Sequence, residues 1–142
     1  MHSCGEASAF IPDLIDAGLD VLEALQATTT LDIAKLRAQC GDQITFMGNI
    51  SSVKMSESDE AIREEIERKV TAGKPGGGYI YHSDHSVPSD VPFERYRYMM
   101  SVLDRVSWYR VKIHPGAPQD QRRPLFCPYV PSLAGRCRDR GM

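Results

Sequence analysis

The sequence predicts an α/β fold in which short parallel strands alternate with helices. Three short apolar runs have the length of buried strands, and each is followed by polar residues and then by a stretch with helical periodicity. Strands that alternate with helices in this way form a parallel sheet through right-handed crossovers. The 142 residues, 42% hydrophobic and 25% charged, are typical of one globular domain.

The first unit begins with a polar cluster, His2-Ser3-Cys4-Gly5, which stands where a strand would end. Apolar side chains then follow at helical spacing over residues 8–17, and Gly18 has the place of a glycine that ends a helix. Residues 20–25 are short and apolar enough for a buried strand, and Gln26 is the polar residue at its end. The chain therefore shows a loop and helix first, and then a complete strand.

The second unit continues with a helix over residues 31–40. We expect Thr30 to be its N-cap and Gly41 to end it. Residues 43–47 form the next strand, which opens into Gly48-Asn49. This pair could offer backbone N–H groups or an amide to an anionic ligand, or it could be a plain turn.

The third helix is predicted to begin near Ser56, because Ser56 and Asp59 resemble a capping box. Gly73 ends it. Its apolar face consists of Ile62, Ile66 and Val70. Its opposite face, which we expect to be solvated, carries Arg63, Glu64, Glu67, Arg68 and Lys69.

The last unit, residues 76–92, holds the densest group of reactive side chains. A glycine triplet, residues 76–78, forms a turn and leads into a strand over 79–81 that ends in His82-Ser83-Asp84-His85. A helix from Pro92 to about residue 111 follows. Its predicted buried stripe consists of Tyr96, Met99, Met100, Leu103 and Val106.

Four such βα units make half of a (β/α)₈ barrel, which typically needs about 250 residues. The chain is too short to close one, and we expect a strand to be missing before His2. Residues 113–142 have no period and are rich in proline and arginine, so we expect a disordered extension or a change of reading frame there. The predicted domains are a partial barrel over 1–112 and a tail over 113–142.

Composition excludes several classes of function. The formal net charge of −2 gives no electrostatic basis for binding nucleic acid or an anionic membrane. No run of about 18 apolar residues could span a bilayer. We therefore expect a cytoplasmic protein. The 4 cysteines are scattered, which favours free thiols or a metal ligand over disulfides.

Two clusters could carry chemistry at the ends of the strands. His2 and Cys4 offer an imidazole and a thiol from one segment, and zinc accepts both as ligands. His85 or His82 would supply a third ligand, because the carboxyl ends of parallel strands lie on one face. Each group also has a structural interpretation: Cys4 as a half-buried thiol, the histidines as donors to carbonyls, and Asp84 as a turn residue.

Four segments of the chain carry a family resemblance: HSCG, IPDLIDAGLDVLEALQ, ITFMGNIS and GGGYIYHSDHSVPSDVPFERYRYMM. Together they resemble the C-terminal half of the uroporphyrinogen decarboxylase superfamily, over about residues 2–111. That superfamily includes porphyrin decarboxylases and zinc-dependent methyltransferases that move methyl groups between corrinoid proteins and thiols. The resemblance implies a (β/α)₈ barrel of which this chain holds roughly the last four units.

The resemblance also implies roles for individual residues. His2 and Cys4 match the His-x-Cys zinc pair of the methyltransferases, and His85 stands where that branch has a third cysteine ligand. In the decarboxylases the same loop carries a Gly-His-Gly, so His85 matches the histidine that contacts substrate carboxylates, although Asp84 and Ser86 replace the glycines. His85 is thus the predicted catalytic residue. The predicted substrate-binding residues are Gln26, Asn49, His82 and Asp84.

Three functions follow from this resemblance. A zinc ion on His2, Cys4 and His85 would activate a thiol for methylation by a methyl-corrinoid protein. A decarboxylase would need no cofactor and would bind a porphyrinogen, with His85 near the acetate and propionate groups. The third possibility is an inactive half-barrel that pairs through its exposed sheet edges with another copy or a partner chain.

Overall fold

In the computed structural model, the residues described are 1–110 and 122–123. The predicted tail over 113–142 therefore lies outside the described residues, apart from 122–123, and its disorder or change of frame stays a prediction. The described part forms β1 (His2–Ser3), η1 (Ser8–Phe10), α1 (Ile11–Asp16), β2 (Val21–Ala24), α2 (Ile33–Cys40), β3 (Thr45–Gly48), α3 (Ser52–Ser56), α4 (Asp59–Gly73), β4 (Tyr79–Ile80), α5 (Phe93–Val106), β5 (Tyr109–Arg110) and β6 (Arg122–Arg123).

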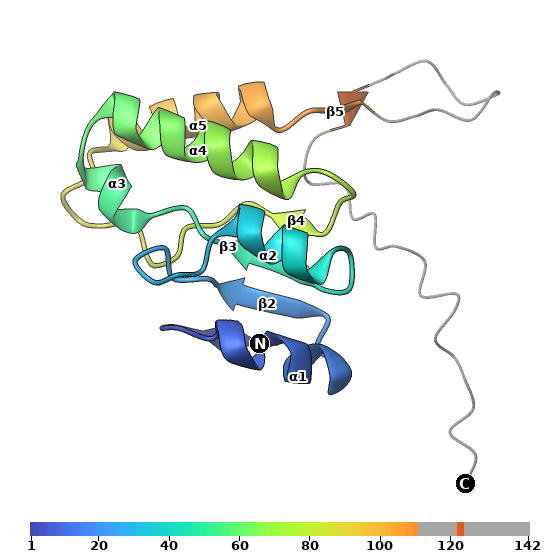
Figure 1. Cartoon of the computed structure of the whole chain (residues 1–142). Helices are drawn as coiled ribbons and strands as arrows, with labels where there is room; N and C mark the ends of the chain where they lie inside the picture. The colour runs from blue at the N-terminus through green and yellow to red at the C-terminus, as the bar shows by residue number, and fades with distance from the viewer. Residues whose placement is uncertain (111–121, 124–142) are drawn as a thin grey trace, which may run out of the picture.

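The main sheet has the strand order β1-β2-β3-β4, and every neighbouring pair is parallel. Figure 1 shows the chain crossing this sheet in sequence order, from the N-terminal segment through β2 and β3 to β4, with α4 and α5 lying side by side. Successive parallel strands joined by helices are the repeating units of a (β/α)₈ barrel. The predicted α/β fold, with four parallel strands of a partial barrel, is confirmed.

The register of the strands separates a core face from an open face. Leu22, Phe46 and Tyr79 are partners across β2, β3 and β4, and all three are buried. They pack in one core cluster with residues of α2, α4 and α5, among them Leu36, Ile66 and Met99. Partners in a parallel sheet point to the same face, so the alternate positions face the other side.

The open face carries a second row of partners. His2, Glu23, Met47 and Ile80 stand opposite one another across β1, β2, β3 and β4. None of the four is buried, and Ile80 is 38% exposed. In a (β/α)₈ barrel the helices cover the outside and this face points inward. The sheet thus presents His2 and Glu23 on the face that a barrel uses as its interior.

The ends of β2 and β3 approach each other closely. Gly48 has a φ of +126°, and a Cβ there would lie 2.3 Å from the carbonyl oxygen of Ala24. Only glycine fits such a contact without moving the backbone. Asn49 then has a φ of +72°, which turns the chain toward α3.

Two helices begin later than the sequence suggested. Thr30 is not the N-cap of α2, because Asp32 takes that place and accepts a hydrogen bond from the Ala34 N–H at 3.0 Å. The predicted start of a long helix at Ser56 is also wrong, because Ser56 ends the short helix α3, which the sequence analysis did not predict. Ser58 is instead the N-cap of α4.

The remaining predictions, for helix ends, for the glycine turn and for the buried face of α5, are confirmed only in part. Gly18 and Gly41 follow their helices with positive φ, and the glycine triplet forms a turn with positive φ at all three positions, as expected. Helix α5 ends at Val106 rather than near residue 111, and β5 and β6 pair antiparallel beyond it. In its stripe Tyr96 is 39% exposed, whereas Val102 is buried.

Helix α4 corrects one prediction about charge. Its apolar face is buried as predicted, but Lys69, which we assigned to the solvated face, is only 3% exposed. The Lys69 ammonium lies 2.6 Å from Glu65 and donates a hydrogen bond to the backbone carbonyl of Asn49. Glu65 also accepts a hydrogen bond from the Ser51 N–H at 3.1 Å. A buried ion pair therefore supports the loop that follows β3.

None of the helices in the described part of the chain combines the length and the apolar character needed to cross a membrane.

Replacing Lys69 by alanine should lower the free energy of unfolding by about 3 kcal/mol, because it leaves the buried Glu65 carboxylate without its main partner. Arg63→Ala on the same helix is the matched control, since Arg63 and Glu67 form an exposed pair 3.7 Å apart. That change should cost less than about 1 kcal/mol. Urea denaturation measures both values, and equal costs would contradict the role given to Lys69.

Candidate functional site

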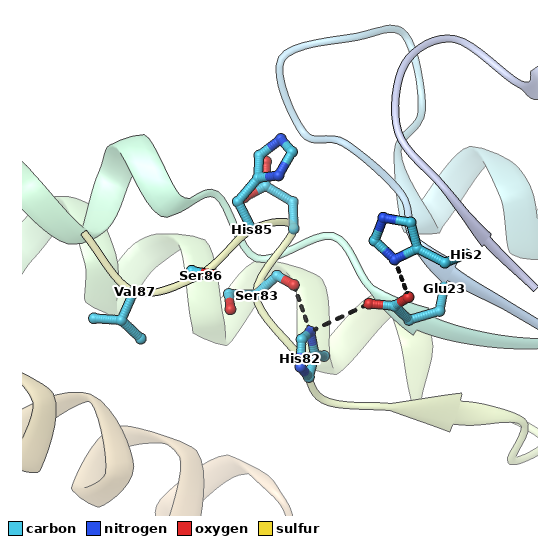
Figure 2. A pocket seen from close by; sticks show the side chains of 8 residues that line it. His2, Glu23, His82, Ser83, His85, Ser86 and Val87 are labelled. Carbon is cyan, nitrogen blue, oxygen red and sulfur yellow. Dashed lines mark hydrogen bonds and ion pairs between the residues drawn. The ribbon is translucent and has the colours of Figure 1, made fainter. Parts of the chain in front are cut away.

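A pocket of about 380 Å³ lies at the carboxyl ends of the parallel strands. Its lining consists of His2, Glu23, His82, Ser83, Asp84, His85, Ser86 and Val87. Figure 2 shows that they come from β1, from β2 and from the loop that follows β4, and that His2, Glu23 and His82 point toward one another. Strand ends are where a (β/α)₈ barrel places its active site. We take this pocket as the candidate functional site.

Glu23 stands at the centre of the polar contacts in the pocket. Its carboxylate accepts a hydrogen bond from His2 Nδ1, and its other oxygen lies 3.9 Å from His82 Nδ1. Figure 2 marks both interactions. The sequence analysis did not select Glu23. The sequence contains a feature that could have identified Glu23, because it is the one charged residue within the apolar run from Val21 to Leu25.

His2 and Cys4 come together as the spacing predicted. His2 Nε2 lies 3.2 Å from Cys4 Sγ, and Cys4 is an exposed free thiol. The same ring meets the Glu23 carboxylate through its other nitrogen, Nδ1. The imidazole and thiol thus form a pair at the edge of the pocket.

The two histidines of the loop after β4 differ in their partners. His82 Nδ1 donates to the Ser83 carbonyl at 2.6 Å and lies beside Glu23. His85 lines the same pocket as His2, but in Figure 2 its ring points away from Glu23. Within the described ranges, no three His, Cys, Asp or Glu side chains gather as a group that could hold a metal ion. The ligand set of His2, Cys4 and His85 stays a prediction.

Asp84 connects three loops. Its side chain is 2% exposed, and its two carboxylate oxygens accept hydrogen bonds from Ala27 N–H at 2.9 Å and Ser52 N–H at 2.8 Å. Its own N–H donates to the Ile50 carbonyl at 2.8 Å. The carboxylate therefore connects the loop after β4 to the loop after β2 and to the first residue of α3, next to His85 in the sequence.

The buried side chain of Asn49 binds backbone groups of the segment that follows β2. It is fully buried; its amide nitrogen donates to the carbonyls of Leu25 at 2.8 Å and Leu31 at 2.9 Å, and its oxygen accepts from Ile33 N–H at 3.0 Å. These bonds satisfy all but one of the lone pairs and hydrogens of the amide. In this structure the side chain serves the loop and does not line the pocket.

Gln26 and Glu6 connect the first two loops in the same manner. Gln26 accepts from Gly5 N–H at 2.8 Å, and Glu6 accepts from the N–H and hydroxyl of Thr30 at 2.9 and 2.6 Å. Hydrogen bonds from Ser8, and then from Thr30, lower the pKa of Glu6 to about 2. Polar side chains thus tie each loop at this end of the sheet to its neighbour.

The predicted site residues have different places in the structure. Among the predicted substrate-binding residues, Gln26, Asn49 and Asp84 bind backbone groups of neighbouring segments. Asp84 also lines the pocket, together with the predicted substrate-binding His82 and the predicted catalytic His85. Contact with a substrate stays a prediction for all five. The pocket was therefore predictable from strand ends, whereas the loop contacts depend on residues far apart in the sequence.

Asp84→Ala should lower the free energy of unfolding by about 3 kcal/mol, because the buried N–H of Ser52 and the partly buried N–H of Ala27 lose a charged acceptor. Hydrogen exchange should speed up at the amides of Ala27 and Ser52. Asp90→Ala is the control, since exposed Asp90 contacts only the Ser56 hydroxyl among the hydrogen bonds described, and it should cost about 0.5 kcal/mol or less. Unchanged exchange at both amides would contradict the proposed bridge.

The Glu6 contact should depend on pH. The pKa of Glu6 is lowered in the folded chain, so its contribution to stability is fully present above the ordinary value of 4.5 and is lost as the pH falls toward about 2. The Thr30 amide resonance should titrate with a midpoint near 2 in an NMR pH series, and Glu6→Gln should abolish that step. A midpoint near 4.5 would show that the contact is absent in solution.

Comparison with known proteins agrees with this architecture. Residues 1–106 match the family model described as uroporphyrinogen decarboxylase (URO-D). The chain is 26% identical over 94 residues to a uroporphyrinogen decarboxylase of Psychromonas ingrahamii, covering 66% of this chain and 26% of that protein. It is 28% identical over 105 residues to one of Chloroherpeton thalassium, covering 72% and 29%.

A uroporphyrinogen decarboxylase of Methylococcus capsulatus is 29% identical over 94 residues, covering 66% of this chain and 26% of the relative. The chain thus spans about a quarter of the length of the curated relatives it matches. The family match extends from β1 to the end of α5 and covers every strand of the parallel sheet. The chain belongs to the uroporphyrinogen decarboxylase (URO-D) family.

Proposed function

We propose that this chain contributes a zinc-binding thiol site to a methyltransferase of the URO-D family. The observation that carries the proposal is the pair of donors His2 Nε2 and Cys4 Sγ, 3.2 Å apart at the edge of the pocket. Ligand bonds of about 2.0 Å to nitrogen and 2.3 Å to sulfur place two tetrahedral zinc donors about 3.5 Å apart. The pair therefore fits two ligand positions of one zinc ion.

The surroundings of His2 support the same proposal. A histidine that binds a metal usually donates its other ring N–H to a carboxylate, and Glu23 is that partner for His2. His85 is the proposed third ligand and lines the same pocket. His82 is the alternative ligand, because it already lies beside Glu23.

The chemistry would be the transfer of a methyl group to a thiol. Bound zinc lowers the pKa of a coordinated thiol and so makes its thiolate available at neutral pH. His2 and Cys4 would bind the ion, Glu23 would orient His2, and Asp84 would hold the loop that carries the other histidines. The methyl donor would be a corrinoid protein, whose cobalt–carbon bond breaks with its electron pair left on cobalt as the sulfur–carbon bond forms.

Porphyrinogen decarboxylation is the second candidate, because the relatives named above are uroporphyrinogen decarboxylases. In that case His82 and His85 would bind the substrate's carboxylate groups, and no cofactor would be needed. A carboxylate from the rest of the full-length protein would stabilise the protonated pyrrole.

The chain by itself could also be inactive until it pairs with other strands. β1 and β4 are the edge strands of the described parallel sheet, and each has one side open to pairing. A second copy or a chain with the remaining strands would complete the sheet there. Light scattering after size-exclusion chromatography distinguishes a monomer from such an assembly.

Metal analysis of the purified chain tests the zinc proposal. We expect about one equivalent of zinc, and cobalt substitution should give a sulfur-to-cobalt charge-transfer band. Cys4→Ala should abolish both, because it removes the only thiol beside His2 in the described part of the chain. Cys40→Ala is the control, since Cys40 is buried in the core.

Zinc content that is unaffected by Cys4→Ala would contradict the proposed ligand pair. A metal-free protein whose full-length form converts porphyrinogens would replace the methyltransferase proposal by the decarboxylase one.

A further inference from the structure

We propose that Glu23 is a positioning residue that holds His2 as the Nδ1–H tautomer and so keeps its Nε2 lone pair available beside Cys4. The evidence lies in one chain of contacts. The Glu23 carboxylate meets His2 Nδ1, and His2 Nε2 meets Cys4 Sγ at 3.2 Å. A carboxylate oxygen accepts, so the ring hydrogen lies on Nδ1 and the thiol hydrogen points to Nε2.

The backbone places Glu23 and His2 next to each other. The two residues are register partners in β1 and β2 and point to the same face of the sheet. The pairing continues on both sides of this position. On one side, Glu23 N–H donates to the Met1 carbonyl at 2.9 Å and the N-terminal ammonium donates to the Val21 carbonyl at 2.7 Å. On the other side, Ser3 pairs with Ala24. The pairing of β1 with β2 therefore places the Glu23 carboxylate near Nδ1 of His2.

The Glu23 and His2 side chains differ in their exposure to solvent. The Glu23 side chain is 24% exposed and the His2 side chain 59% exposed. A contact of a carboxylate at such an exposed position contributes little to stability. The expected effect of Glu23 is therefore on the tautomer of His2 and only slightly on folding.

His82 shows the same preference through a different acceptor. Its Nδ1 donates to the Ser83 carbonyl at 2.6 Å and lies 3.9 Å from the second oxygen of Glu23. A carbonyl oxygen can only accept, so His82 also carries its hydrogen on Nδ1. Both imidazoles next to Glu23 thus have Nε2 as the nitrogen that can accept a hydrogen or bind a metal ion.

This tautomer has a consequence for ligand binding. The Nε2 and Sγ atoms that share a hydrogen in the metal-free chain are the two atoms that the proposed zinc site uses. The metal-binding part of the inference rests on the proposed function. The tautomer itself does not, because it follows from the contacts of the chain alone.

The test uses the full chain without metal, labelled with ¹⁵N in its histidines, at a pH where the rings are neutral. Long-range proton–nitrogen correlation spectra report which ring nitrogen carries the hydrogen. We expect His2 to be the Nδ1–H tautomer in the wild type. In Glu23→Ala its tautomer ratio should move to that of a short peptide with residues 1–7, which has no partner for Nδ1.

Glu23→Gln is the second variant, in case the alanine variant does not fold. Glutamine keeps the shape but offers both an acceptor and a donor to Nδ1, so the two tautomers should become mixed. Glu67→Gln is the matched control, because Glu67 lies on α4 and pairs with Arg63. It should leave the His2 spectrum unchanged.

A wild-type His2 with its hydrogen on Nε2, or a tautomer unchanged in both Glu23 variants, would overturn the inference. A zinc competition titration adds a second readout, and Glu23→Ala should weaken zinc binding about 10- to 100-fold. If the wild type binds no zinc, the proposed function fails, whereas the spectra still decide the role of Glu23.

Discussion

The buried carboxylate of Asp84 is the contact on which the geometry of the pocket depends. Burying a carboxylate is costly unless hydrogen bonds replace its water, and here the N–H groups of Ala27 and Ser52 do so. Ala27 belongs to the loop after β2 and Ser52 is the first residue of α3, while Asp84 follows β4. The position of His82 and His85 is therefore coupled to all three strands through one side chain.

The register of the strands places the core residues on one face of the sheet and the polar residues of the pocket on the other. One face carries Leu22, Phe46 and Tyr79, which build the core with the helices. The other face carries His2 and Glu23, side by side on neighbouring strands. Polar groups can gather there because that face is not needed for the core, so the pocket costs the fold little apolar burial.

The two proposed activities would use different groups at this end of the sheet. The methyltransferase proposal rests on the Cys4 thiol and the His2 imidazole, with Glu23 bound to His2. The decarboxylase proposal rests on the histidines after β4, which line the pocket. Membership of the family is compatible with both, since a barrel fold is shared by many chemistries and the site decides between them.

The sequence by itself determined the alternation of β2, β3 and β4 with α2, α4 and α5 and the proximity of His2 to Cys4, because these follow from local periodicity and spacing. It also placed the chemistry at the strand ends. It missed β1 and α3, which are too short to have a clear period. Only the tertiary structure decided the partners of Glu23, Asn49 and Asp84, since those partners are brought near by the sheet and its loops. No local pattern encodes contacts of that kind, which arise from register and crossover geometry.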